Sequence, residues 1–175
     1  MLPGAPSSRR PTWKTLCVSE IEYTFRAAAR AVILDPADRV LLVWGCDPAR
    51  PDAGQWWYTP GGGIEEGESA AQAVRRELYE EIRLTVDEVG SAIFEETNDF
   101  EFDGHLLRQH NTFFMVRVCD TFEPDLSELS TYERSSLLSV EWLTVDELRS
   151  SPYAVYPTNL AELVASLISA EPAGR

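Results

Sequence analysis

Short apolar runs separated by turn-forming residues dominate the first third of the chain. Residues 23–34 are mostly small and apolar, Asp-Pro-Ala-Asp follows at 35–38, and residues 40–44 resume the apolar run. Proline and aspartate between two such runs favour a turn, so the pattern predicts a strand, a turn and a second strand. Residues 45–55 hold two prolines, two aspartates and two glycines, which predicts a loop before the aromatic residues 56–58.

A helical period begins after residue 68. Ser69 and Gln72 have the spacing of a capping box. Apolar residues then recur at spacings of three, four and four, at Ala71, Val74, Leu78 and Ile82. These spacings place the apolar side chains on one helix face, so the segment predicts an amphipathic helix.

The second half of the chain shows strand patterns followed by helical ones. Residues 91–96, 110–118 and 137–143 predict strands, and a polar, Glu-rich stretch at 121–136 separates the last two. Thr144 and Glu147 would cap a short helix. The last helix is predicted from Pro157 and from the apolar stripe Leu160, Leu163, Val164, Leu167 and Ile168. The order of elements is mixed α/β without a repeat.

Length and composition indicate one soluble domain. A chain of 175 residues with 44% apolar and 25% charged residues is ordinary for a single globular domain. We expect a flexible arm at 1–20, the domain at 21–170 and a tail at 171–175. No apolar run approaches the roughly 20 residues that a membrane span needs, so no membrane partner is expected.

Charge and cysteine content narrow the partners and the location. The 29 acidic and 15 basic residues give a net charge of −14, which disfavours a nucleic-acid polymer as a partner. Cys17, Cys46 and Cys119 are odd in number and form no Cys-x-x-Cys pair. They predict neither a disulfide framework nor a structural zinc site, and a cytoplasmic location fits best.

Three carboxylates on the predicted helix carry the candidate chemistry. At 100° per residue, Glu77, Glu80 and Glu81 share one helix face. Oxygen ligands suit Mg²⁺ or Mn²⁺ better than zinc. Taken alone, the triplet is more simply a solvated acidic face, and the glycines at 61–63 and 67 could merely permit a turn.

The joint spacing of glycines and glutamates changes that interpretation. Residues 62–84 resemble the Nudix box, which reads Gly, five residues, Glu, seven residues, then Arg-Glu-hydrophobic-x-Glu-Glu-x-Gly-hydrophobic. The matching residues are Gly62, Glu68, Arg76, Glu77, Leu78, Glu80, Glu81 and Leu84. Arg83 stands where the family has glycine, at a helix exit where a left-handed residue is often used. A non-glycine residue there costs roughly 1 kcal/mol.

The resemblance, which covers about residues 23–150, implies a fold and a reaction. The fold would be the Nudix-type α/β/α sandwich around a mixed sheet. The reaction would be the metal-dependent, MutT-like hydrolysis of a diphosphate bond, with water attacking phosphorus in a nucleoside diphosphate linked to another moiety. The substrate would be a small diphosphate compound, and a homodimer is compatible with this assignment.

The resemblance also implies roles for individual residues of the box. Glu77, Glu80 and Glu81 would hold Mg²⁺ or Mn²⁺, and Glu81 would also be catalytic. Glu68 and Arg76 would support catalysis by bracing the loop and the helix. Gly62 and Gly63 would lie against the substrate.

The general base and the substrate contacts lie outside the box. Glu133, in the Glu-rich loop before the strand at 137–143, is our candidate base, although a solvated loop residue is an equally good interpretation. Glu95, Glu96 and Glu101 compete with it for that role.

Three further residues are candidates for binding the substrate. Arg30 interrupts an apolar strand and could reach a phosphate, as could Arg50 from its loop; the simpler interpretation of each is a surface arginine. Trp57 could stack on a base, but core packing is the safer expectation for an aromatic residue beside a strand.

Two other functions remain open. One is a Nudix-like sensor that binds a nucleotide or ADP-ribose without hydrolysis, which the retained glutamates disfavour. The other is isoprenoid diphosphate isomerisation, which the same fold hosts with a catalytic cysteine. Cys46 is the one cysteine before the box that could serve, and it lies in a Pro-rich loop.

Overall fold

A computed structural model describes residues 22–127, 129–131 and 133–170. The arm expected at 1–20 and the tail expected at 171–175 lie outside these residues. Within the described ranges, no helix has both the length and the apolar character needed to cross a bilayer.

The first two strands form as the sequence predicts. β1 (Thr24–Leu34) and β2 (Val40–Cys46) are antiparallel and pair at Leu34 and Val40. The turn between them is held by Asp35, whose carboxylate accepts the N–H groups of Ala37 and Arg39 at 2.9 Å each. The aspartate side chain therefore stabilises the turn by accepting backbone N–H groups in place of a carbonyl.

The strands form one mixed sheet of order β5-β6-β1-β2-β3-β8. β1 pairs in parallel with β6 (His105–Arg117) and antiparallel with β4 (Gly61–Gly63). β2 pairs antiparallel with β3 (Gln55–Tyr58) and β7 (Leu137–Leu143). β5 (Phe94–Phe102) and β8 (Ala154–Tyr156) are the outer strands of this order.

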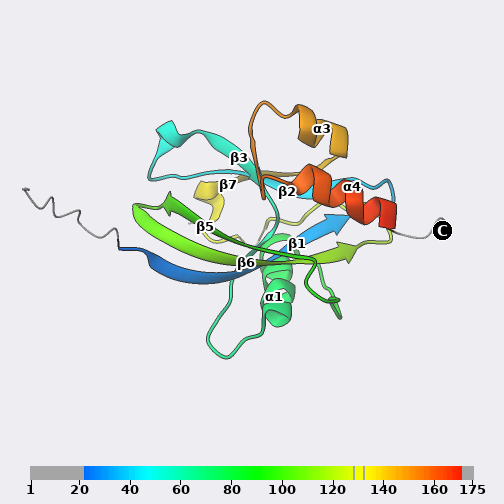
Figure 1. The fold of residues 1–175 in the computed structure, drawn as a ribbon, viewed down its shortest axis with the longest axis horizontal. Helices are drawn as coiled ribbons and strands as arrows, with labels where there is room; N and C mark the ends of the chain where they lie inside the picture. Colours follow the sequence, from blue (N-terminus) through cyan, green and yellow to red (C-terminus); the bar gives the residue numbers. More distant parts are fainter. Residues whose placement is uncertain (1–21, 128, 132, 171–175) are drawn as a thin grey trace, which may run out of the picture.

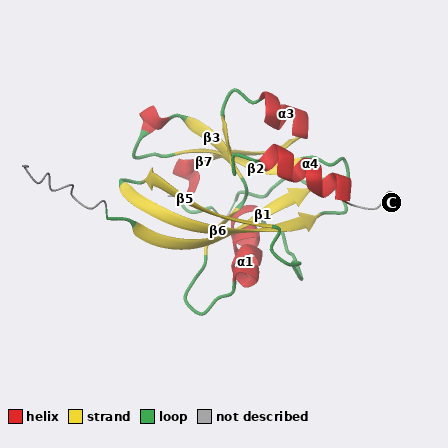
Figure 2. Ribbon diagram, viewed as in Figure 1, coloured by secondary structure: helices red, strands yellow, loops and turns green. Residues whose placement is uncertain are grey.

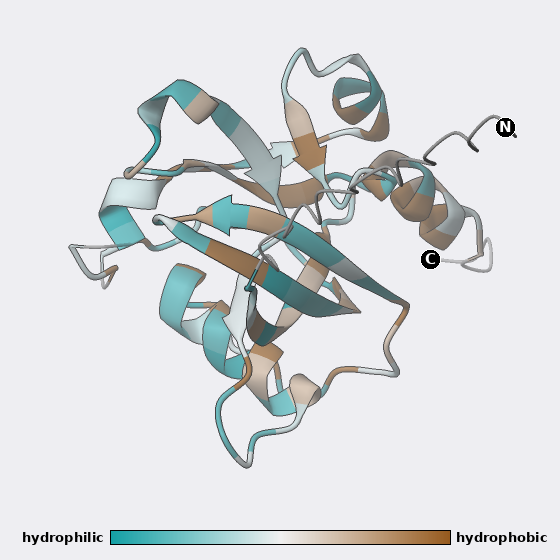
Figure 3. Cartoon of the chain, turned by 60° about the vertical axis from the view of Figure 1, so that its left-hand side comes forward, coloured by the Kyte–Doolittle hydropathy of each residue, from teal (hydrophilic) through white to brown (hydrophobic). Residues whose placement is uncertain are grey.

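Helices cover both faces of the sheet, which confirms the predicted α/β/α sandwich (Figures 1 and 2). α1 (Ala70–Ile82) lies on one side, and α3 (Val145–Ser150) and α4 (Leu160–Ala170) lie on the other. Figure 3 shows helix α1 as largely hydrophilic, while helix α4 carries more hydrophobic residues.

Each face of the sheet has its own apolar core. The core under α1 includes Ala29, Ala31, Ile33, Leu41, Val74, Leu78 and Ile82. The core under α3 and α4 includes Val32, Leu34, Val40, Leu42, Phe113, Leu148, Leu160 and Val164. Alternate residues of β1 thus enter opposite cores, as the two-residue period of a strand requires. Burial of each large side chain contributes roughly 1.5–3 kcal/mol.

Both predicted capping boxes are present. Ser69 accepts the Gln72 N–H and Gln72 accepts the Ser69 N–H at the start of α1. Thr144 and Glu147 make the same reciprocal pair before α3. These bonds satisfy backbone donors that the first helical turn leaves without partners.

The predicted boundaries of the two strands that form β5 and β6 were wrong. β5 starts at residue 94 and not at 91, and it continues to residue 102; β6 starts at residue 105 and not at 110. Asp103 and Gly104, which join them, have positive φ values of 50° and 74°. An Asp-Gly pair with two positive φ values is a favoured hairpin connection, and it extends both strands through a largely polar sequence.

Four short elements differ from the sequence prediction. The expected glycine loop contains β4, and the Pro-rich loop contains a 3₁₀ turn at Pro51–Ala53. α2 (Glu133–Ser136) and β8 were not predicted. Such short segments carry little periodicity, and β4 and β8 are defined by pairing with β1 and β3.

The helix exit at Arg83 keeps the left-handed conformation that the glycine of the box would adopt. Arg83 has φ 57° and ψ 24°, and its N–H points to the carbonyls of Leu78 and Tyr79. Its guanidinium lies 4.8 Å from the centre of the Tyr79 ring, and such a contact contributes roughly 0.5–1 kcal/mol at an exposed site. Arg83 therefore provides the left-handed helix exit for which the box uses glycine.

Candidate active site

The outer edge of β4 is the centre of the site. The bonds Ala31 N–H to Pro60 and Ile64 N–H to Ala27 show that residues 60, 62 and 64 face β1. Gly61 and Gly63 therefore direct their polar groups outward, because bonding alternates along an antiparallel pair. The carboxylate of Glu81 accepts the Gly61 N–H at 2.9 Å. Arg30 donates to the Gly61 carbonyl at 3.3 Å and Arg76 donates to the Gly63 carbonyl at 2.8 Å.

Glycine is required along β4 because neighbouring groups leave no room for a side chain. Gly61 has φ 126°, and a Cβ atom there would lie 2.3 Å from the Ala29 carbonyl oxygen. A Cβ atom on Gly62 would lie 2.4 Å from the carboxylate of Glu77. The glycines thus bring the α1 carboxylates into contact with the backbone of β4.

Arg76 connects this strand to the carboxylates around it. It contacts Glu68 at 2.9 and 3.1 Å, Glu77 at 2.9 Å and Glu80 at 2.9 Å. The hydrogen bonds to Arg76 lower the pKa of Glu68, and those to Glu68, Glu77 and Glu80 raise the pKa of Arg76. The geometry fits the bracing role expected of Glu68 and Arg76.

Glu77 and Glu81 are carboxylates in surroundings that disfavour negative charge. Burial raises the pKa of Glu81 to about 7, although the Gly61 N–H and the charge of Arg30 act in the opposite direction. Burial also raises the pKa of Glu77, with Arg76 opposing it. Glu80 differs, since 51% of its side chain is exposed and it is held by Arg76.

The raised pKa of Glu81 predicts a pH-dependent stability. A folded-state pKa of about 7 against an ordinary 4.5 means that the folded chain holds the proton more tightly than the unfolded chain. In metal-free protein, this contribution to the free energy of unfolding is present below about pH 4.5 and is lost as pH rises toward 7. Glu81→Gln lacks this loss, so its stability relative to the wild type should rise by about 1–3 kcal/mol between pH 4.5 and 8.

Urea unfolding of both proteins in EDTA at the two pH values measures this change. Glu88→Gln, at an exposed position after α1, serves as the control and should show no comparable change. A stability difference for Glu81→Gln that is the same at both pH values would contradict the expected titration.

Arg30 lies inside the site, where its guanidinium group donates hydrogen bonds to neighbouring residues. It donates to the Thr59 carbonyl at 2.8 Å and to Asn111 at 3.2 Å, besides Gly61. Its guanidinium lies 5.6 Å from the centre of the Tyr58 ring, a neighbour that the sequence did not indicate. Burial lowers the pKa of Arg30, while the charge of Glu81 raises it. The structure thus brings Arg30 together with Glu81.

Glu133 also belongs to this neighbourhood. It is the first residue of α2, accepts the Ser130 N–H at 2.7 Å, and its charge contributes to the raised pKa of Glu81. The competing glutamates Glu95, Glu96 and Glu101 lie on β5. Glu95 is 3.9 Å from His110, and Glu101 pairs with Arg50.

Arg50 and Trp57 are not brought to the box carboxylates. Arg50 pairs with Glu101 and lies 3.8 Å from Asp47, so its charge is neutralised between the loop and β5. Trp57 packs against the α3 and α4 core, with its ring centre 4.7 Å from that of Trp44. The expectation of core packing therefore describes Trp57 better than a substrate contact at this site.

The donor set of the site fits a hard divalent cation. Glu77 and Glu81 offer desolvated carboxylate oxygens beside the β4 edge, and a dication would stabilise their charged forms. Among residues 22–127, 129–131 and 133–170, no three Asp, Glu, His or Cys side chains already converge on one ion position. Arg76 engages Glu77 and Glu80 instead.

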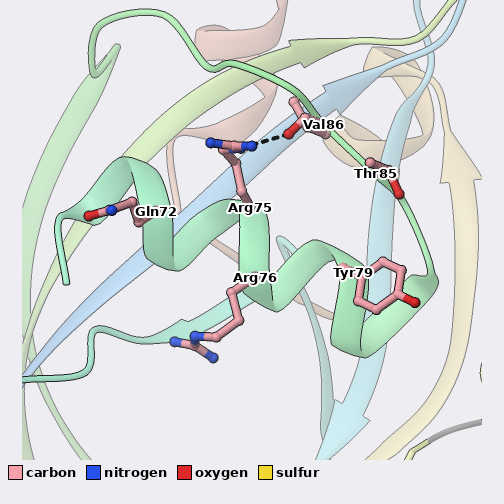
Figure 4. Close-up of a pocket in the computed structure, with 6 residues that line it drawn as sticks. All are labelled: Gln72, Arg75, Arg76, Tyr79, Thr85 and Val86. Carbon is pink, nitrogen blue, oxygen red and sulfur yellow. Dashed lines mark hydrogen bonds between the residues drawn. The ribbon is translucent and has the colours of Figure 1, made fainter.

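A separate cavity of about 270 Å³ lies on the outer side of α1. Gln72, Arg75, Arg76, Tyr79, Thr85 and Val86 line it (Figure 4). Arg75 donates to the Val86 carbonyl at 2.7 Å, whereas Arg76 extends from the helix in a different direction. Arg75 therefore fixes the segment after α1, and Arg76 serves the carboxylate cluster.

Curated relatives share part of the sequence. An RNA pyrophosphohydrolase of Francisella philomiragia is 38% identical over 80 residues, which are 45% of this chain and 46% of that protein. Another RNA pyrophosphohydrolase, from Shewanella loihica, is 58% identical over 33 residues, 19% of each chain. The chain thus matches less than half the length of these relatives.

Solved structures and a family model cover most of the chain. A MutT protein from Methanosarcina mazei Go1 superposes with a TM-score of 0.61 at 19% identity, covering 86% of this chain and 97% of that one. A C. elegans Ap4A hydrolase superposes with a TM-score of 0.59 at 20% identity, covering 82% and 98%. At these identities the likeness concerns the fold. The model of the NUDIX domain matches residues 24–165, so the chain belongs to the NUDIX family.

Proposed function

We propose that this chain hydrolyses a diphosphate bond in a nucleoside diphosphate linked to another moiety, with Mg²⁺ or Mn²⁺ as the cofactor. The observation that carries the proposal is the pair of desolvated carboxylates, Glu77 and Glu81, beside the glycine strand of a NUDIX domain. On a merely solvated acidic helix face both side chains would be exposed, whereas Glu77 and Glu81 are only partly exposed.

Glu77 and Glu81 would hold the metal ion together with Glu80, which lies one residue before Glu81. When bound, a dication withdraws charge from phosphate oxygens and lowers the pKa of a water molecule. The candidate ligands are all carboxylate oxygens, and the chain has two histidines. This choice of ligands favours Mg²⁺ or Mn²⁺ over zinc.

The surrounding residues hold β4 in place and leave room for the substrate to approach it. Gly62 and Gly63 present backbone without side chains, which lets a substrate approach β4 closely. Arg76 and Glu68 hold the outer edge of β4 against α1. Arg30 supplies a fixed positive charge beside Glu81, which opposes proton uptake by that carboxylate.

Glu133 is our candidate for the general base. Its support is that its charge contributes to the raised pKa of Glu81, after burial and other charges. Glu133→Gln should lower kcat by about 10²- to 10⁴-fold and leave the affinity for substrate nearly unchanged. The control is Glu95→Gln; equal losses in the two variants would contradict the assignment.

A substrate panel assayed with Mg²⁺ and with EDTA tests the proposed function. The panel should contain ADP-ribose, a sugar nucleotide, Ap4A, an oxidised nucleoside triphosphate and an RNA oligonucleotide with a 5′ triphosphate. We expect Mg²⁺-dependent release of a phosphate monoester from a small nucleotide, because the net charge of −14 repels a polymer. Calorimetric binding of ADP-ribose with no turnover of any compound would instead favour the sensor function.

A further inference from the structure

Arg26 of β1 lies against the glycine strand, although no motif includes it. A Cβ atom placed on Gly63 would lie 3.1 Å from Nη2 and 3.2 Å from Nε of Arg26. The guanidinium group of Arg26 thus lies close to Gly63, although less close than the carboxylate of Glu77 lies to Gly62. Burial raises the pKa of Glu77, and the positive charge of Arg26 is one of the influences that oppose this rise, which places Arg26 within electrostatic reach of the box.

Arg26 differs from the other arginines near β4 because none of the described residues pairs with it. Arg30 donates to two backbone carbonyls, and Arg76 donates to one carbonyl and three glutamates. No residue in the part of the chain that the structure describes makes a hydrogen bond or an ion pair with Arg26. An arginine that is exposed at a carboxylate-lined edge and left unpaired is available to an anion.

A backbone donor lies on the same side of the strand. The register that points the Gly61 N–H toward Glu81 points the Gly63 N–H to the same outer edge. No described side chain accepts this second N–H. A guanidinium fork and a backbone N–H beside it form a common arrangement for holding a phosphate group.

Beyond Arg26 the surface is hollowed into a cavity of about 380 Å³. Its lining residues are Phe25, Arg26, Ala27, Thr97, Arg108 and His110. Arg108 is paired with Asp99 and lies over the rings of Tyr23 and Phe25. Arg26 is therefore the cation in this lining for which no carboxylate partner is found among the described residues, and Phe25, which is 75% exposed, is the large apolar residue of the lining.

We propose that Arg26, with the Gly63 N–H, is a specificity-determining residue that binds the substrate phosphate farther from the attacked phosphorus, and that the group attached to this phosphate enters the Phe25–Arg108 cavity. The inference rests on the proposed hydrolase function. It implies that compounds with a second substituent on the diphosphate are better substrates than inorganic pyrophosphate. Arg26 acts on binding and takes no proton.

Steady-state kinetics of Arg26→Gln and Arg26→Lys test this role on the best substrate of the panel. Loss of a hydrogen bond to a charged group should raise KM about 10- to 100-fold in Arg26→Gln, with kcat within about threefold of the wild type. Arg26→Lys should recover part of the affinity, because it restores the charge without the fork. The matched control is Arg149→Gln, an exposed arginine on α3 paired with Asp146 and Glu162, which should behave as the wild type.

Calorimetric titration of inorganic pyrophosphate into the wild type and into Arg26→Gln, with Mg²⁺ present, separates this inference from the proposed function. If the wild type hydrolyses a nucleotide and Arg26→Gln keeps a normal KM, the role of Arg26 is refuted while the function stands. If the wild type hydrolyses nothing, weaker pyrophosphate binding by Arg26→Gln still supports the phosphate site, and equal binding refutes it. A lower melting temperature in Arg26→Gln together with a proportional loss of kcat would indicate a structural role instead.

Discussion

Glu81→Gln should lower kcat by about 10³-fold or more while leaving the fold intact. The substitution removes one negative charge from the group that we expect to hold the metal ion, and it keeps the size of the side chain. The amide oxygen can still accept the Gly61 N–H that Glu81 accepts in the structure. Activity with saturating Mg²⁺, together with circular dichroism and thermal unfolding, measures the two effects separately.

Glu66→Gln is the matched control for that experiment. Glu66 is exposed, lies between the glycines of the same loop and is not one of the residues that match the box. It should retain activity within about twofold, as expected for a surface substitution with a negligible effect on the fold. Near-normal turnover of Glu81→Gln would exclude a direct role for this carboxylate in the reaction.

Gly61→Ala should cost at least about 3 kcal/mol of the free energy of unfolding. The new methyl group would lie 2.3 Å from the Ala29 carbonyl oxygen and 2.8 Å from the Arg30 Cα, both backbone atoms of a buried strand. The φ value of 126° adds conformational strain. Urea unfolding measures the loss, and reduced soluble expression is expected if the protein falls below its stability threshold.

Gly67→Ala separates the steric effect from the conformational one. Gly67 also has a positive φ, 81°, but nothing lies within 4 Å of the position of its Cβ atom. This variant should lose only about 1 kcal/mol. If both variants lose the same amount, the close approach of β4 to β1 does not determine the requirement for glycine at position 61.

The sequence was informative where a residue's neighbours lie within one turn or one strand of it. The two capping boxes, the apolar face of α1 and the spacing of Glu77 and Glu81 are local patterns, and all appear in the structure. The burial of Glu81 could not be read from that spacing, because it depends on β4, which is 20 residues away at Gly61.

The residues that the sequence placed less well are those whose partners are distant. Arg30 and Arg50 resemble each other as isolated arginines, yet one enters the site and the other pairs with Glu101 across 51 residues. No sequence pattern indicated Arg26 as a site residue. Its position beside Gly63 depends on the pairing of β4 with β1, which joins distant parts of the chain. Trp57 and Tyr58 are neighbours, and the strand alternation sends only Tyr58 toward Arg30.

The outer edge of β4 also bears on self-association. An unpaired strand edge is a template on which another chain can add a strand. Here Glu81, Arg30 and Arg76 occupy both polar groups of Gly61 and the carbonyl of Gly63. The single remaining N–H is too little for a ladder of hydrogen bonds, so the side chains that build the site also protect this edge from intermolecular strand addition.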